Sequence, residues 1–207
     1  MKAVLLSVKP KWCEMFASGK KTIEVRKTAP KLETPFKVYV YCTKERMTRM
    51  PSMYAYLHKN EPGACAEYGT IETWGEIGDV IVNPHLASKH VSFGMHGKVI
   101  GSFVCDRVRL CIPFGLKGHL LSQEVYREMC LTKEQLDKYG GLKTLYGWHI
   151  TEPKLFDKPR ELGEFKHKIK VPWAWQENGK AIGYFYKWQP ITRAPQSWVY
   201  CETIDER

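Results

Sequence analysis

The sequence predicts an α+β fold that is mainly β: a small β-barrel with short flanking helices and one insertion. Three observations predict it. Many short segments show strand-like alternation, few segments have helical spacing, and strands do not alternate with helices as they do in βαβ units. We find no internal repeat and no low-complexity segment. A chain of 207 residues is long enough to bury a hydrophobic core without disulfides or bound metals. We therefore predict one domain, 1–207, with an insertion at about 44–93.

The N-terminal elements are a buried strand and a short helix. The apolar run at 3–8, AVLLSV, predicts the strand. Pro10 is suited to the first helical position, and Trp12 and Phe16 follow at helical spacing. The pair at 18–19, Ser-Gly, is expected to end the helix.

A strictly alternating segment follows at 20–27, KKTIEVRK. Such alternation predicts a strand with Ile23 and Val25 on one face, and Glu24 and Arg26 on the other. Glu24 and Arg26 are therefore expected to lie close enough for a charge pair or a shared ligand.

The segment at 35–44 predicts another strand because valines and tyrosines alternate in it. The pattern is weaker over 44–93, which we interpret as an insertion and not an independent domain. Methionine spacing at 47–57 suggests a helical piece, and GDVIVNP at 78–84 resembles a short strand between turn residues.

The middle of the chain predicts strands and capped helices. The segment 97–111 is expected to form one long strand or a bent pair, with Gly101 at the bulge or bend. The segment 122–139 predicts one helix or two short ones, capped by Ser122 and again by Thr132 and stopped by the glycines that follow.

The C-terminal third returns to strand at 145–162, and 197–204 is expected to add a strand that closes the sheet. A basic connection, FKHKIKVPWAWQ, occupies 165–176 between them. Its lysines at 166–170, followed by tryptophans, suit single-stranded RNA. The lysines also alternate with other residues, which equally suits the solvent-exposed face of an edge strand, where Lys discourages aggregation.

The charge is unevenly placed along the chain. The net charge is +10, and residues 1–50 hold 12 Lys and Arg against 4 Glu. Clustered Lys and Arg favour a polyanionic partner because phosphate contacts release counterions. A Lys-rich solvated surface is the alternative.

Other features exclude several classes. The seven cysteines are odd in number, scattered and without a CxxC pair, which predicts reduced thiols in a cytoplasmic protein. The spacing of Cys42, His58, Cys65 and His85 matches no zinc ligand frame, so we expect no metal. The absence of a Gly-rich phosphate loop argues against a nucleoside triphosphatase, and we expect no cofactor. No apolar run reaches the roughly 18–20 residues of a membrane span.

Four segments resemble those of one known family. The run SGKKTIEVRK at 18–27 resembles the N-terminal signature of ASCH domains, G-x-K-T-x-E-x-R. The segments 97–106, 146–165 and 194–202 also resemble ASCH proteins of Gram-positive bacteria and their phages, and they occur in the same order. The resemblance covers most of the chain outside the insertion.

This resemblance implies a PUA-like pseudobarrel with a cleft beside the signature strand, and a role linked to RNA. Some ASCH proteins are similar to ribonucleases. Some small bacterial ones hydrolyse the acyl amide of N4-acetylcytidine, using a signature Lys, a Thr three residues later and a more distant Glu. Lys21 matches that Lys, whereas Glu24 stands at the Thr position.

The residue types themselves suit a nucleotide-like ligand. The planar fork of Arg26 grips a phosphate or a carbonyl, and Glu24 accepts hydrogen bonds from a base amino group or acts as a general base. Lys21 binds phosphate or, when buried with a lowered pKa, serves as nucleophile or base. The alternative is a structural Glu–Arg pair on a barrel strand with Lys21 solvated.

Five further residues are candidates for the cleft. Lys9 and Trp12 follow the first strand and would form its rim, although a Trp more often packs in the core. Lys20 adjoins Lys21, and Tyr41 ends its strand. Ser197 lies in the predicted closing strand.

Three functions follow from these observations. The first is a binding module whose basic cleft recognises RNA or a modified nucleoside. The second is a hydrolase, either an N4-acylcytidine amidohydrolase or a metal-independent ribonuclease, with Lys21 and Glu24 as catalytic residues. The third is a phage-type protein-interaction adaptor in which the cleft is vestigial. His149 on its strand is more often structural than functional.

Overall fold

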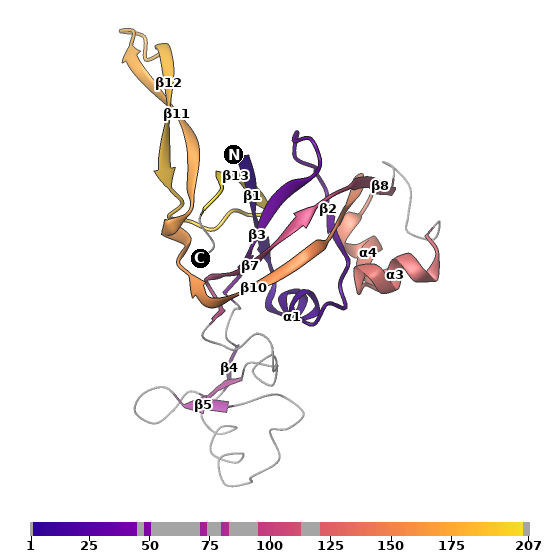
Figure 1. Cartoon of the computed structure of the whole chain (residues 1–207). Coiled ribbons are helices and arrows are strands. Elements are labelled where there is room, and N and C mark those ends of the chain that lie inside the picture. Colours follow the sequence, from indigo (N-terminus) through magenta and orange to yellow (C-terminus); the bar gives the residue numbers. More distant parts are fainter. Residues whose placement is uncertain are drawn as a thin grey trace.

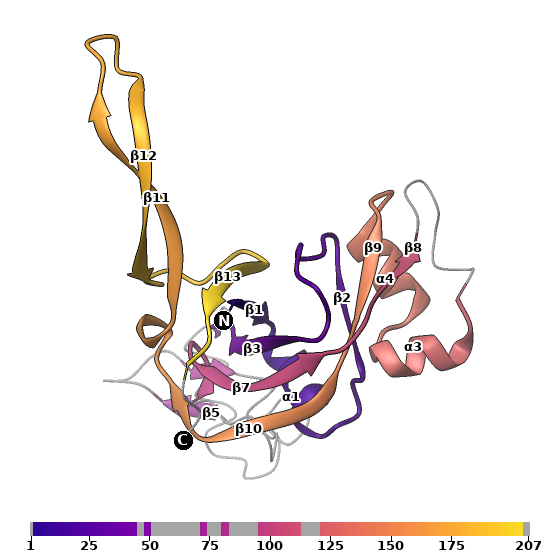
Figure 2. The same cartoon turned by 45° about the horizontal axis from the view of Figure 1, so that its top comes forward.

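The computed structural model describes residues 2–44, 95–112 and 121–204, together with the backbone of three short strands at 48–50, 71–73 and 80–82. This part of the chain is mainly β with three α-helices, which confirms the predicted class. Figures 1 and 2 show α3 and α4 beside β8 and β9 on one side of the molecule, and a long hairpin of β11 and β12 on the opposite side.

The centre of the fold is a five-stranded sheet with the order β10-β7-β3-β1-β13. The predicted strands at 3–8, 35–44 and 197–204 are all part of it. β1 pairs in parallel with β3 and antiparallel with β13, so the last strand of the chain joins the first. Its members are β1 (Lys2–Val8), β3 (Phe36–Cys42), β7 (Val99–Cys105), β10 (Thr151–Arg160) and β13 (Trp198–Glu202).

Alternation along β1 places side chains in two cores. Val4 and Leu6 face one core together with Phe16 of the first helix. Leu5 faces the other core, where Phe165 packs against Tyr39 with ring centres 5.0 Å apart. Both faces of the sheet are therefore covered, which explains why β1 is almost uniformly apolar.

A second sheet positions the signature segment. It has the order β2-β9-β8 and consists of β2 (Ile23–Arg26), β9 (Leu145–His149) and β8 (Val108–Ile112). One face packs on a third core that includes Val25 and Met129. The other face carries Glu24, which lies directly opposite Trp148 of β9.

The helices begin and end where the sequence predicts. Helix α1 (Pro10–Ala17) has Pro at its first position. The segment 122–139 forms two helices, α3 (Gln123–Met129) and α4 (Lys133–Gly140). Ser122 caps α3, and Thr132 caps α4 in a reciprocal capping box with its third residue.

The segment 97–111 is the bent pair of the two predicted possibilities, since β7 and β8 belong to different sheets. Gly101 lies beside register shifts on both of its neighbours, β3 and β10. A Cβ at this position would collide with the Lys154 carbonyl, so the close approach of β10 requires glycine here.

The predicted insertion lies largely outside the described residues. Within it, β4 (Thr48–Met50), β6 (Val80–Val82) and β5 (Ile71–Thr73) form a three-stranded sheet, which confirms the strand predicted within 78–84. The helical prediction for 47–57 is wrong at 48–50, because these residues pair with β6. Pairing between segments distant in sequence overrides local spacing.

The segment 165–176, predicted as a basic connection with an edge strand as the equal alternative, is mainly a strand. Residues Lys166–Trp175 form strand β11, which pairs with β12 (Ala181–Pro190) as a two-stranded hairpin. Its lysines alternate with less exposed residues, as expected for a strand with one wet face. A 3-10 helix, η3 (Leu162–Glu164), precedes it.

A closed barrel is not found among the described strands, because the five-stranded sheet ends at β10 and at β13. The PUA-like barrel therefore stays a prediction. None of the described helices combines the length and the apolar composition of a membrane span.

The six described cysteines are free thiols, and burial raises the pKa of Cys201 to about 12 from its ordinary value of 9.0. The unfolded thiol therefore loses its proton at a lower pH than the folded one. We expect the free energy of unfolding to fall between about pH 9 and pH 12, by at most about 1.4 kcal/mol per pH unit from this thiol. Below pH 9 both states keep the proton, so the titration of this thiol does not change the stability.

Urea denaturation at pH 8 and pH 10 measures this slope, with Cys201→Ala as the reference. The expected result is a smaller loss of stability at pH 10 in the variant than in the wild type. Equal losses in both proteins would contradict the prediction.

Candidate functional site

Three charged side chains of the signature segment lie together and are buried: Lys21, Glu24 and Arg26. The Glu24 carboxylate lies between the two cations. Its Oε1 is 2.7 Å from Nη2 of Arg26, and its Oε2 is 3.5 Å from Nζ of Lys21. We call these three residues the charged cluster. The predicted Glu–Arg pair is thus present, while a solvated Lys21 is not found, since its side chain is 3% exposed.

The cluster forms because of the alternation of β2 and the turn before it. Glu24 and Arg26 project from the face of β2 opposite to Val25, which is buried against α3 and α4. Lys21 comes from the turn after α1, and its backbone N–H donates to the Met15 carbonyl.

Backbone carbonyls from distant segments hold the two cations. Lys21 Nζ donates to the Met129 carbonyl at 2.6 Å, and Arg26 Nη2 donates to the Ser7 carbonyl at 2.7 Å. Lys21 Nζ also lies 5.3 Å from the centre of the Trp12 ring, within the range of a cation–π contact. Trp12 therefore covers one side of the cluster.

The cluster carries a net charge of +1. Cys13 and Tyr139 are titratable groups that interact electrostatically with Glu24 and Arg26. Burial raises the pKa of both side chains, so both are neutral at pH 7 and add no charge. Two buried donors nearby have no partner among the described residues: Nε of Arg26, and the indole N–H of Trp148. A positive site with unpaired donors suits an anionic or carbonyl-bearing ligand.

An open hollow of about 740 Å³ lies beside α3 and α4 and shares no lining residue with the charged cluster. Cys130 on its wall contacts the Lys20 carbonyl through Sγ at 3.4 Å, one residue from Lys21. The described lining carries three cations and one carboxylate. The basic cleft expected beside the signature strand stays a prediction. The lining residues are Lys11, Leu121, Gln123, Tyr126, Arg127, Cys130, Leu131, Thr132, Lys133, Glu134 and Gln135.

The other predicted cleft residues lie at varied distances from the cluster. Lys9 and Lys20 are exposed, and the Lys9 carbonyl accepts the N–H groups of Trp12 and Cys13. The Ser197 carbonyl accepts a hydrogen bond from the Ser7 N–H, and the Ser7 carbonyl accepts one from Arg26. Ser197 is therefore connected to Arg26 through Ser7. Tyr41 is buried in the core with Leu5, on the face of the sheet turned away from α1, and is not brought to the cluster.

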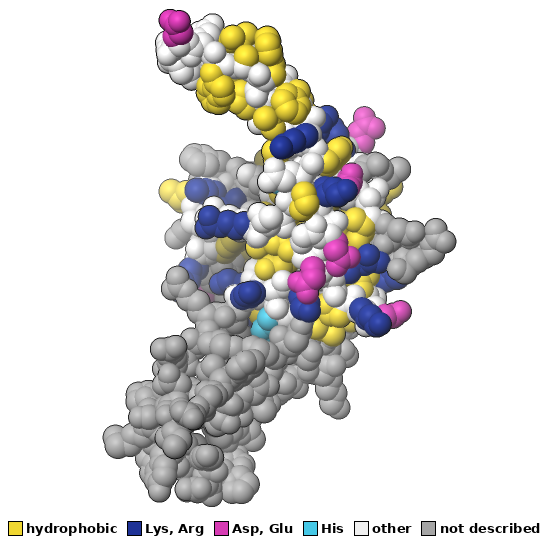
Figure 3. All heavy atoms as spheres, turned by 90° about the vertical axis from the view of Figure 1, so that its left-hand side faces the viewer, with side chains coloured by type: hydrophobic (Ala, Val, Ile, Leu, Met, Phe, Trp, Pro, Cys, Tyr) yellow, Lys and Arg dark blue, Asp and Glu magenta, His cyan; other side chains and the backbone are white. Residues whose placement is uncertain are grey.

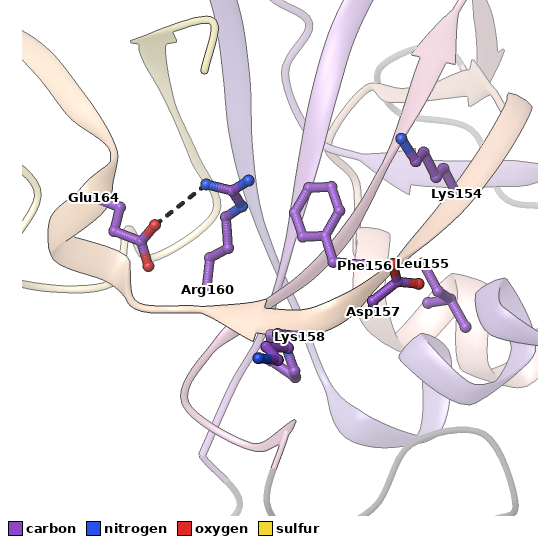
Figure 4. Close-up of a pocket in the computed structure, with 8 residues that line it drawn as sticks. Lys154, Leu155, Phe156, Asp157, Lys158, Arg160 and Glu164 are labelled. Carbon is purple, nitrogen blue, oxygen red and sulfur yellow. Dashed lines mark hydrogen bonds and ion pairs between the residues drawn. The ribbon is translucent and has the colours of Figure 1, made fainter. Parts of the chain in front are cut away.

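A second hollow, of about 470 Å³, follows β10 where the register with β7 shifts (Figure 4). Arg160 in its wall bonds Glu164 at 3.3 Å. Its lining comes from one continuous segment, Lys154, Leu155, Phe156, Asp157, Lys158, Pro159, Arg160 and Glu164, and shares no residue with the cluster.

His149 forms a surface pair away from the cluster. Its Nδ1 lies 2.7 Å from Oδ1 of Asp106, and this hydrogen bond lowers the pKa of the Asp106 carboxyl. His149 faces away from the core that holds Trp148, in line with the predicted alternation.

No group of three metal-ligating side chains occurs within the part of the chain that the structure describes. Of the four residues considered for zinc, only Cys42 belongs to that part, and it is buried in the core.

Comparison with known proteins gives matches among solved structures. No family model matches the chain, and no curated protein matches it. The chain is similar to the crystal structure of ASCH from Zymomonas mobilis, with 15% sequence identity and a TM-score of 0.45 over 77% of this chain and 73% of that one. Crystal structures of two mutant proteins of the same ASCH match with the same identity and TM-score, covering 78% and 77% of this chain and 77% and 74% of theirs. These structures bear the name of the family that the sequence resembles. At this identity and TM-score the likeness assigns no ligand, reaction or site residue to this chain.

The sequence did not reveal the groups that hold the cluster. Two of them, the Ser7 and Met129 carbonyls, are backbone atoms, which leave no signal in residue type. Trp148 was predictable only in part: its alternation placed it on a core face, but its position opposite Glu24 depends on the register of β2 and β9.

Proposed function

We propose that the charged cluster binds a nucleoside-containing ligand, either free or within RNA. The observation that carries this proposal is the buried net charge of +1 with the unpaired Arg26 Nε donor. A buried unbalanced charge is costly, and it is retained where a ligand supplies the missing charge or acceptor.

The polar groups suit the edge of a base and its phosphate. The Glu24 carboxylate accepts from an exocyclic amino group, while the donors of Lys21 and Arg26 bind a carbonyl or a phosphate oxygen. In this proposal the ligand enters from the basic hollow, whose cations attract it, and the Trp12 ring moves aside and stacks on the base.

Binding is tested by isothermal titration with cytidine 5′-monophosphate and N4-acetylcytidine. Lys21→Met is the informative variant because it leaves Glu24 and Arg26 as a balanced pair and removes the net charge. We expect it to remain folded, with a stability loss of at most about 1–3 kcal/mol because the Met129 carbonyl loses its donor, and to weaken binding by about 10- to 100-fold, the value of a charge-assisted hydrogen bond.

Two controls accompany this test. Lys21→Arg keeps the charge and is expected to retain part of the affinity, whereas Lys2→Met removes a charge from an exposed position and should change nothing. Wild-type protein that binds neither compound, or Lys21→Met that binds as tightly as the wild type, would refute the proposal.

Hydrolysis of an acylated nucleoside is the second candidate function, favoured by the buried amine of Lys21 3.5 Å from the Glu24 carboxylate. Such an arrangement lets the carboxylate exchange a proton with the amine or with water. The reaction adds water across the acyl amide of N4-acetylcytidine and releases cytidine and acetate. Chromatography of the titration mixtures distinguishes the two: cytidine formed by the wild type and not by Lys21→Met supports hydrolysis, and unchanged substrate supports binding alone.

A further inference from the structure

The hairpin of β11 and β12, which we call the arm, projects from the body of the protein (Figures 1 and 2). Each of its strands has ten residues, and among the described strands the two pair only with each other. At about 3.3 Å per residue they extend roughly 30 Å. The arm is fixed at its base, where the buried Phe165 accepts a backbone hydrogen bond from Ile191.

The arm exposes most of its large apolar side chains. Figure 3 shows apolar atoms gathered along the upper part of it, with several basic side chains below them. An isolated two-stranded hairpin is only marginally stable in water, and a contiguous exposed apolar surface marks a binding site. Seven of these side chains are between 44% and 65% exposed: Trp173, Trp175, Ile182, Tyr184, Phe185, Tyr186 and Trp188.

On one face of the arm, two lysines of β11 lie across from three aromatic rings of β12. Lys168 lies opposite Trp188, and Lys170 lies opposite Tyr186, so the side chains of each pair share a face. Lys168 Nζ is 5.0 Å from the centre of the Tyr186 ring, and Lys170 Nζ is 3.7 Å from that of Tyr184. We call these five residues the ladder.

The charge of the arm is strongly positive. Residues 166–190 contain five Lys and one acid, Glu177, which belongs to the turn at the tip. A second copy of the arm would therefore meet its own charge, and like charges disfavour such a contact. Protein interfaces are also depleted in Lys, whereas Lys is the residue type that neutralises phosphates.

We propose that the ladder binds single-stranded nucleic acid. Unpaired bases expose the flat faces that aromatic rings stack on, and a backbone phosphate accompanies each base. A duplex hides its base faces, so the ladder discriminates against it. This inference does not depend on the charged cluster, because it rests on residues of a different sheet.

Fluorescence anisotropy with a labelled single-stranded RNA of about 15 nucleotides tests the ladder. The triple variant Tyr184→Ala/Tyr186→Ala/Trp188→Ala removes the rings, and Tyr184→Phe/Tyr186→Phe/Trp188→Phe keeps them. We expect the alanine variant to lose at least about 100-fold in affinity, and the phenylalanine variant to stay within about 5-fold of the wild type.

The lysines are tested through the salt dependence of binding. Lys168→Gln/Lys170→Gln is expected to reduce the slope of log Kd against log salt concentration by about 1.4, and Lys168→Arg/Lys170→Arg to preserve it. Competition by unlabelled single-stranded DNA and by duplex of the same sequence separates the nucleic-acid types. We expect the single-stranded DNA to compete at least about 10-fold more strongly than the duplex.

Three outcomes would overturn the inference. One is a wild type that binds no single strand at low salt. Another is equal affinity of the alanine and phenylalanine variants. The third is a wild type that sediments as a dimer and an alanine variant that sediments as a monomer, because the partner of the arm would then be a second copy. Failure of the wild type to bind nucleosides, with single-strand binding intact, would instead count against the cluster alone.

Discussion

Replacing Glu24 with Gln is expected to lower the free energy of unfolding by about 3–5 kcal/mol, which is the cost of leaving buried charges without their partner. Glu24 is the acid that pairs with both Lys21 and Arg26, and the side chains of all three are at most 11% exposed. Gln preserves the shape of the side chain and removes only its charge. The loss therefore measures the electrostatic role of the carboxylate, and urea denaturation at pH 7 detects it.

A triple variant separates stability from function at the same site. Lys21→Met/Glu24→Leu/Arg26→Met replaces the charged cluster with apolar side chains, and such replacements are often neutral or stabilising. We expect it to be more stable than Glu24→Gln and to bind no nucleotide. A Glu24→Gln protein within about 1 kcal/mol of the wild type would show that water reaches and screens the cluster.

Replacing Trp148 with Ala is expected to cost a similar amount, about 3–5 kcal/mol, because it removes a large side chain from the core. Trp148 has no exposed surface. Its ring centre lies 6.0 Å from that of Phe36 and 5.9 Å from that of Trp198, both in edge-on arrangements. Its removal therefore opens a cavity between the β2-β9-β8 sheet and the central five-stranded sheet.

Trp148→Phe is the control for this experiment. Phe keeps an aromatic ring and lacks the indole N–H, which has no acceptor among the described residues. We therefore expect the Phe variant to recover at least half of the stability lost in the Ala variant, as measured by urea denaturation. Equal losses in the two variants would indicate that the N–H is hydrogen-bonded in solution.

Local patterns predicted much of the secondary structure. The Ser122 and Thr132 caps, the proline at the start of α1 and the alternation of β2 depend on neighbouring residues, and all are confirmed. Where pairing partners are distant, local patterns were insufficient. The helix predicted across 48–50 is a strand of a sheet, because Thr48 pairs with Val82. Alternation did indicate a strand at 165–176 as one of two possibilities, and its partner β12, the next segment of the chain, was not predicted.

The charged cluster shows the same division. Alternation predicted that Glu24 and Arg26 share a face, since side chains two residues apart on a strand project the same way. Burial of Lys21 was not predictable, because it depends on the Met129 carbonyl, 108 residues further along the chain. The nearness of Ser7 to Arg26 likewise follows from the packing of β1 beside the second sheet.

The sequence by itself determined the mainly β class, the strand that carries the signature, the caps of the helices and the basic character of the chain. The tertiary structure alone decided that three charges are buried together with a net charge of +1, and that aromatic and basic residues form an exposed arm. The physical reason is range. Capping, alternation and turn formation act over a few residues, whereas burial and strand register arise only when segments far apart in the chain pack together.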